Sequence, residues 1–122
     1  MPNKTFLLLA ALSGFVAVAL GAFGAHGLKP HLSAEGLQWF ETANRYHFYH
    51  TVALLAVALL SKNDSKLLRY AGFAFLLGIA LFSGSLYAMA VTGMKSLGMI
   101  TPLGGLAFLA GWGMLGTYSI KN

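Results

Sequence analysis

The sequence predicts an all-α membrane protein, a four-transmembrane-helix antiparallel bundle, and three observations support that prediction. Hydrophobic residues make up 57% of the chain and charged residues only 9%, whereas soluble domains are about 25% charged. The few charged residues leave four uncharged intervals, three of them long. The length of 122 residues allows a single domain, 1–122.

The uncharged intervals define the expected spans. A helix that rises 1.5 Å per residue needs about 20 residues to cross a hydrocarbon core of about 30 Å. Intervals 5–28, 70–94 and 96–120 are long enough, but 46–61 is short. The short span can begin near residue 38 if Glu41 and Arg45, an i,i+4 pair in the favourable order, lie on a turn in the headgroup region. We therefore predict helices at about 5–25, 38–61, 69–91 and 102–120.

Local signals support the first and last of these helices. The first apolar run is longer than the 7–15 residues of a signal-peptide core and three more spans follow it, so we expect a retained helix. In Thr101-Pro102, the threonine suits an N-cap, and the proline suits the first helical position, where its missing N–H costs nothing.

The distribution of cations predicts the orientation. With four spans, both termini and the 61–69 loop share one side, which carries five cations: Lys4, Lys62, Lys66, Arg69 and Lys121. The other side carries three: Lys29, Arg45 and Lys95. Because cytoplasmic loops are enriched in Lys and Arg, we expect a multi-pass protein of the cell (inner) membrane with both termini in the cytoplasm.

Several function classes are disfavoured by what the chain lacks. It has no cysteine, which excludes disulfides, iron–sulfur clusters and cysteine nucleophiles. The eight Lys and Arg residues are scattered, so we expect no nucleic-acid partner. No acid, lysine or arginine lies deep in a predicted span, which disfavours a proton-coupled transporter. No hydrolase motif is present, and we expect no enzymatic activity.

Polar residues instead gather at the outer end of the predicted bundle, which is the end away from the cytoplasm. Helix 38–61 opens with a polar stretch, and at 100° per residue Asn44, His50 and Thr51 all lie within about 60° of His47. His26 ends the first helix. Polar residues at the same expected depth are Ser83, Ser85, Tyr87 and Thr101.

Three interpretations of this polar cluster remain open. The structural one is that imidazoles and hydroxyls tie helix ends together. The second is a metal or haem site on His26, His47 and His50, because histidine is a common metal ligand. A fourth ligand is not evident, and we expect no cofactor. The third is a site for a small polar or quinone-type ligand, to which Tyr, Thr and His would donate hydrogen bonds.

Rows of small residues suggest how the helices associate. Lipid supplies no hydrophobic drive for association, so close packing through small residues takes its place. Such residues recur every fourth position in three rows: Ser13, Ala17, Gly21, Ala25; Ala80, Gly84, Ala88; and Ala107, Gly111. We therefore expect a structural or accessory component of the envelope whose partners are the lipid bilayer and other membrane proteins or itself. A small-solute carrier or pore formed by an oligomer is a further alternative.

Four blocks of sequence, in order, carry a resemblance to a known family. They are Gly21–Leu28, Tyr46–His50, Leu81–Tyr87 and the pair Leu97-Gly98 with Ile100–Gly105. With these blocks, the chain resembles the DUF-423 (YgdD-like) family of small bacterial inner-membrane proteins. The resemblance covers nearly the whole chain and implies four membrane helices with no assigned activity. The positions it marks here are His26, His47, His50, Ser83, Ser85, Tyr87, Thr101 and Pro102.

Overall fold

The computed structural model describes residues 3–61 and 65–121, and within these ranges the chain is helical with no strand. The first segment joins α1 (Lys4–Ala19), the π-helical turn η1 (Leu20–Gly24), α2 (Ala25–Leu28) and the 3-10 turn η2 (Lys29–His31). The second is α3 (Ala34–Leu60). The third joins α4 (Lys66–Gly78), the π-helical turn η4 (Ile79–Ser83) and α5 (Gly84–Thr92), and the 3-10 turn η5 (Lys95–Met99) leads into α6 (Thr101–Lys121). The prediction of an all-helical chain is confirmed.

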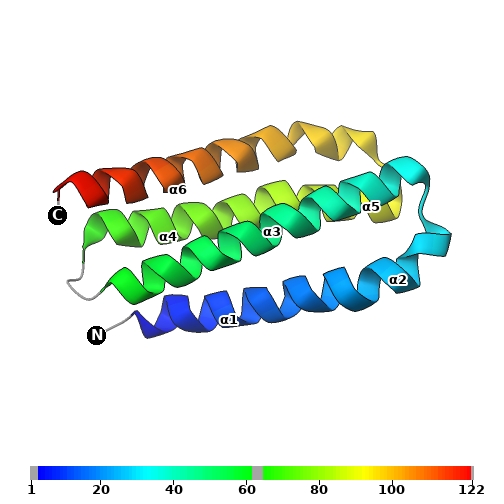
Figure 1. Cartoon of the computed structure of the whole chain (residues 1–122). Coiled ribbons are helices and arrows are strands. Elements are labelled where there is room, and N and C mark those ends of the chain that lie inside the picture. Colours follow the sequence, from blue (N-terminus) through cyan, green and yellow to red (C-terminus); the bar gives the residue numbers. More distant parts are fainter. Residues whose placement is uncertain (1–2, 62–64, 122) are drawn as a thin grey trace.

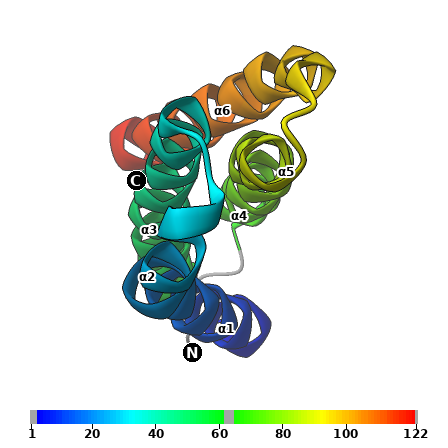
Figure 2. The same ribbon diagram turned by 90° about the vertical axis from the view of Figure 1, so that its right-hand side faces the viewer.

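The segments pack side by side and alternate in direction, so both termini lie at one end (Figure 1). α1 packs on α3, α3 packs on α4 and α5, and α6 packs on α4 and η4. Viewed from the end, α3 and the α4–α5 segment lie between α1 and α6 (Figure 2). α3 is therefore the helix that most of the others meet.

Three segments are long and apolar enough to cross a membrane: Lys4–His31, Lys66–Thr92 and Lys95–Lys121. α3 is as long, at 27 residues, but its first half is rich in charged and polar side chains. Length and composition therefore support three spans, and α3 differs from them by its polarity.

α3 begins earlier than the expected residue 38 because Ser33 caps it. Its hydroxyl accepts a hydrogen bond from the Gly36 N–H at 2.9 Å, which satisfies one of the unpaired amides of the first turn. Asn3 caps α1 in the same way, accepting from the Phe6 N–H at 3.0 Å. The earlier start places Glu41 and Arg45, expected in the headgroup region, two to three turns into α3. The expectation that no acid, lysine or arginine lies deep in one of the long helices is therefore wrong for α3.

The two π-helical turns interrupt corresponding places in the first and third segments. In η1 the Ala25 N–H bonds to the Leu20 carbonyl, and in η4 the Gly84 N–H bonds to the Ile79 carbonyl, so each bond spans five residues. Both turns meet the same turn of α3. A Cβ on Gly21 of η1 would lie 2.5 Å from Asn44 Oδ1, and Ser83 of η4 donates to the Ala43 carbonyl at 2.8 Å.

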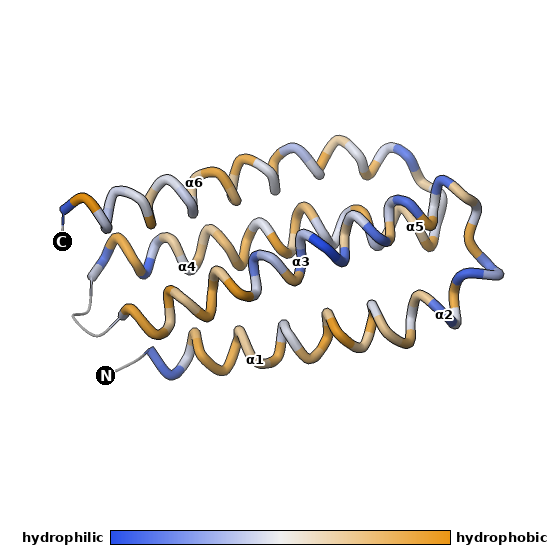
Figure 3. Tube along the Cα trace, in the orientation of Figure 1, coloured by the Kyte–Doolittle hydropathy of each residue, from blue (hydrophilic) through white to orange (hydrophobic). Residues whose placement is uncertain are grey.

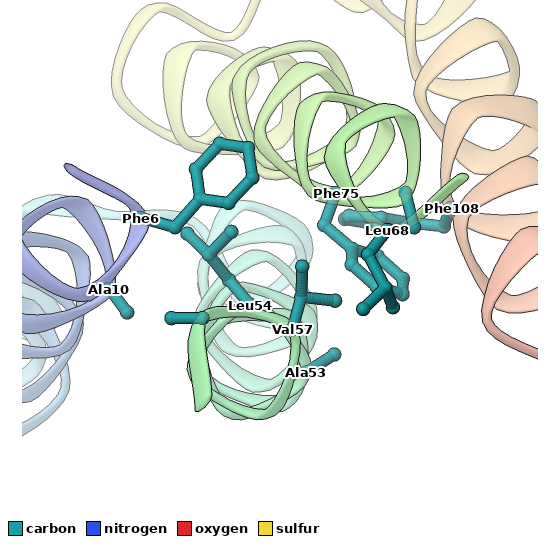
Figure 4. Close-up of a cluster of buried hydrophobic side chains, with 10 residues drawn as sticks. Phe6, Ala10, Ala53, Leu54, Val57, Leu68, Phe75 and Phe108 are labelled. Carbon is teal, nitrogen blue, oxygen red and sulfur yellow. The ribbon is translucent and has the colours of Figure 1, made fainter. Parts of the chain in front are cut away.

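The apolar core lies toward the end that carries the termini, where α1, α3, α4 and α6 converge. Figure 4 shows Phe6 of α1 beside Leu54 of α3, with Phe75 and Phe108 gathered near Leu68. Leu54, Leu68 and Phe75 are fully buried. Aromatic rings thus fill the space between the helices.

Glycines provide the surfaces on which these rings pack. A Cβ on Gly72 would collide with Phe6, on Gly78 with Phe108, and on Gly111 with Phe75. Of the predicted rows, Ser13, Ala17 and Gly21 do face α3. In the second row, by contrast, Ala80 is exposed. Four-residue spacing identifies a row of small residues along a helix, but it does not tell whether that row contacts a neighbouring helix.

The closest backbone approach is at Gly104, and it yields a prediction. A Cβ there would collide with the backbone of Phe82, which cannot move aside as a side chain can. We expect Gly104→Ala to lower the free energy of unfolding in detergent by about 1–3 kcal/mol, as overpacking does. Gly113→Ala on the same helix is the control, because nothing lies within 4 Å of its Cβ position. Equal stability of the two variants would contradict the packing described.

Candidate functional site

Polar side chains gather around the middle of α3 rather than at the outer end. His47 lies at the midpoint of α3, and its neighbour Asn44 bonds to the Ala17 carbonyl, in the middle of the apolar run of α1. Figure 3 shows the hydrophilic colour of α3 reaching the middle of the molecule beside largely apolar stretches of α1 and α4. Asn44 and His47 thus lie nearer the middle of α3 than the prediction of an outer-end cluster implied, and α3 begins at Ala34, four residues before the expected start.

His47 connects three helices through its two ring nitrogens. Nε2 lies 3.0 Å from Ser13 Oγ of α1, and Nδ1 lies 3.0 Å from the Tyr87 hydroxyl of α5. Ser13 Oγ also lies 2.6 Å from Thr51 Oγ1. Asn44 Nδ2 bonds to the Tyr87 hydroxyl at 3.1 Å and to the Ala17 carbonyl at 2.8 Å. We call these five side chains (Ser13, Asn44, His47, Thr51 and Tyr87) the His47 network.

The two ends of the network fix the direction of every hydrogen bond in it. Thr51 donates its one hydroxyl proton to the His47 carbonyl at 2.8 Å, so it accepts from Ser13. Ser13 in turn accepts from His47, which must carry its proton on Nε2. At the other end the Asn44 amide donates to Tyr87, and Tyr87 donates to the bare Nδ1. One proton arrangement is thus consistent with every hydrogen bond of the network.

His50 adopts the opposite tautomer on the other side of α3. Its Nδ1 lies 2.7 Å from the Tyr46 carbonyl, which can only accept, so Nδ1 carries the proton. Its Nε2 then accepts from the Trp112 indole N–H at 3.0 Å, because indole can only donate. The ring also stacks on Phe108 with centroids 3.5 Å apart. His50 therefore connects α3 to α6.

The predicted metal or haem site does not fit this geometry. His47 and His50 are directed to different neighbours, and each lone pair already accepts a hydrogen bond. His26 is exposed on α2. Among the residues in the described ranges, no group of three or more His, Cys, Asp or Glu side chains could hold a metal ion. The structure thus separates the three histidines that the sequence had grouped.

The remaining predicted residues secure the α4–α5 segment. Ser83 is fully buried and bonds to α3 through the Ala43 carbonyl. The Ser85 hydroxyl donates to the Phe82 carbonyl at 3.0 Å and contacts Thr101 Oγ1 at the start of α6. Thr101, expected as an N-cap, thus joins α5 to α6 through its side chain.

Two residues of the site were not among those predicted. Ser13 was noted only as a member of a small-residue row, although a hydroxyl within an apolar helix needs a partner. Trp112 carries the same kind of signal although its side chain is partly exposed, because an indole N–H in an apolar helix has few acceptors other than a side chain of a neighbouring helix. With both included, every buried side-chain nitrogen or oxygen in the described ranges has a partner.

An open groove lies between α3 and α6, beside His50. Its volume is about 890 Å³ and its lining is almost wholly apolar or aromatic. The residues that line it are Tyr46, Tyr49, His50, Phe82, Pro102, Gly105, Leu106, Phe108, Leu109 and Trp112. Aromatic side chains thus make up half of this lining, and two of the lining residues, His50 and Trp112, bond to one another through their ring nitrogens.

The tautomers give a direct prediction. Nitrogen-15 spectra of the histidine rings in detergent micelles at neutral pH should show His47 protonated at Nε2 and His50 protonated at Nδ1. His47→Gln and His50→Gln assign the signals by removing one set each. The same tautomer at both rings, or a doubly protonated ring at either, would contradict the bond directions derived above.

Comparison with known proteins finds relatives that are named as membrane proteins. The family described as "Protein of unknown function (DUF423)" matches residues 20–105. A UPF0382 membrane protein of Haemophilus influenzae is 50% identical over 122 residues, covering all of this chain and 98% of the relative. The UPF0382 membrane protein YwdK of Bacillus subtilis is 44% identical over 120 residues, covering 97% of this chain and 98% of the relative.

A third relative is named for its compartment. The UPF0382 inner membrane protein YgdD of Escherichia coli is 41% identical over 116 residues, covering 94% of this chain and 88% of the relative. No solved structure matches the chain. The family match and these identities over nearly the full length agree with the four blocks noted in the sequence, and the chain therefore belongs to the DUF423 (UPF0382) family of membrane proteins.

Proposed function

We propose that this protein is a non-enzymatic structural or accessory component of the membrane that acts through helix–helix contacts. The observation that carries the proposal is that the polar groups of the His47 network are engaged in hydrogen bonds within the protein. The hydroxyls, the amide nitrogen and the imidazole of the His47 network bond to one another or to backbone carbonyls. What the helices offer to their surroundings is then mainly apolar surface.

The fixed bond directions argue against proton transport through the network. A proton wire must reverse its hydrogen bonds after each transfer. Here the Asn44 amide can only donate at one end, and the His47 carbonyl can only accept at the other. Reversal would leave both ends unsatisfied in a medium without water, which is costly. A role as adhesive between helices matches the known use of polar residues in membranes.

We further propose that α3 is a fourth span, which makes the fold a four-helix bundle in the inner membrane. Its 27 residues match the length of its neighbours. The described cations at the end with the termini, Lys4, Lys66, Arg69 and Lys121, favour a cytoplasmic location for that end; Lys62 lies outside the described residues. A reporter fused to the C-terminus should be active only in the cytoplasm. Activity on the outer side would refute this orientation.

A second candidate function is binding of a quinone-type ring ligand. The groove between α3 and α6 supports it, because aromatic side chains of both helices line a space open to the lipid. The hydroxyls of Tyr46 and Tyr49 are the polar groups available there, since both His50 nitrogens are engaged.

One preparation tests both functions. The protein is extracted from membranes in a mild detergent, and its absorption spectrum, metal content, extractable small molecules and particle mass are measured. We expect no haem band, no stoichiometric metal and a particle heavier than one chain with its detergent. Stoichiometric haem or metal, or a solitary chain, overturns the structural role. A stoichiometric extracted quinone favours the second candidate.

A further inference from the structure

An exposed stripe runs along the outward face of α3. Its members are separated alternately by four and three residues, and all are exposed: Glu41, Arg45, Phe48, Val52, Leu55 and Leu59. This is the spacing at which two helices supercoil around each other in a coiled coil. We call these six residues the α3 stripe.

α1 leaves part of the α3 stripe uncovered. A groove of about 310 Å³ lies between α1 and α3, and its lining is Leu7, Ala10, Ala11 and Gly14 of α1 with Phe48, Thr51, Val52 and Leu55 of α3. Three members of the stripe, Phe48, Val52 and Leu55, therefore border an open space and are exposed.

Two charges of opposite sign lie at one end of this stripe. Arg45 follows Asn44, whose amide bonds to Ala17 in the middle of the apolar run of α1, so Arg45 lies well inside the span proposed for α3. In the described part of the chain, no carboxylate lies within ion-pairing distance of the Arg45 guanidinium, and no cation lies within that distance of the Glu41 carboxylate. Charges that face acyl chains are expensive, and in membrane proteins they are normally paired.

We propose that the α3 stripe is the interface of a homodimer, in which Arg45 of each copy pairs with Glu41 of the partner subunit. Copies of one chain insert with the same orientation, so a two-fold axis along the membrane normal places their α3 helices parallel. The two charges are four residues apart, a rise of about 6 Å. The arginine side chain leans toward the helix N-terminus and hence toward the level of Glu41.

The pair of charges selects a second copy over other occupants. A two-fold interface brings the same patch of both subunits together, so a patch must complement itself. A stripe that carries both an acid and a base complements itself, because Arg45 of each copy can pair with Glu41 of the other in two equivalent ion pairs. An anionic lipid would satisfy Arg45 but would repel Glu41. The inference rests on the role in helix–helix contact proposed above, and it names the partner.

The test measures self-association between two differently labelled copies in liposomes, by energy transfer. Wild-type copies should associate, and Arg45→Glu or Glu41→Arg alone should weaken association at least tenfold, because like charges then face each other. Mixing the two single variants should restore it, since one copy supplies two acids and the other two bases. Lys29→Glu, an equal charge reversal on η2, is the control and should leave association unchanged.

A cross-link provides a second readout that leaves the charges intact. The chain has no cysteine, so Val52→Cys on the stripe should form an oxidised dimer, and Leu106→Cys on α6 should not. Monomeric wild-type protein, failure of the mixed variants to associate, or stronger cross-linking at residue 106 overturns the dimer. If the dimer is overturned but purified particles still contain another protein, the proposed structural role survives. If copies associate but the protein holds stoichiometric haem or metal, the structural role is refuted and the dimer survives.

Discussion

A polar side chain that is buried between packed helices has no water to bond to, so its partners must come from neighbouring helices, and in this chain the buried His47 imposes that requirement. Its Nε2 and Nδ1 nitrogens reach Ser13 of α1 and Tyr87 of α5 at 3.0 Å each. The distances hold only if the two helices lie on fixed sides of α3 at a fixed height. The imidazole thereby sets the register of three helices at once.

Other features of the fold follow from that register. Asn44 can reach both Tyr87 and Ala17 only because residue 21 is a glycine, whose missing Cβ leaves room for the amide. The π-helical turns η1 and η4 bring Gly21 and Ser83 against the same turn of α3. On the opposite side, His50 and Trp112 hold α6 near α3 at one point. The open groove lies beside that point.

Much of the fold could be predicted from sequence, because apolar length is a strong signal. The helical class and the polar residues around His47 and Tyr87 follow from composition and spacing. The start of α3 could not be found by charge intervals, since it depends on the local cap at Ser33. With those four residues included, His47 becomes the midpoint of α3. The sequence grouped His47 with His50 because both lie within one 120° arc of α3. Different parts of that arc face different helices, so His47 contacts α1 and α5 while His50 contacts α6.

The central claim is that the His47 network acts as one unit across α1, α3 and α5. Ser13 and Tyr87 bond to opposite nitrogens of one ring, so a double-mutant cycle of Ser13→Ala and Tyr87→Phe measures coupling through that ring. Free energies of unfolding in detergent should show a coupling of at least about 0.5 kcal/mol, as expected within a shared hydrogen-bond network. Effects that add to within about 0.3 kcal/mol, as for independent sites, would contradict the account.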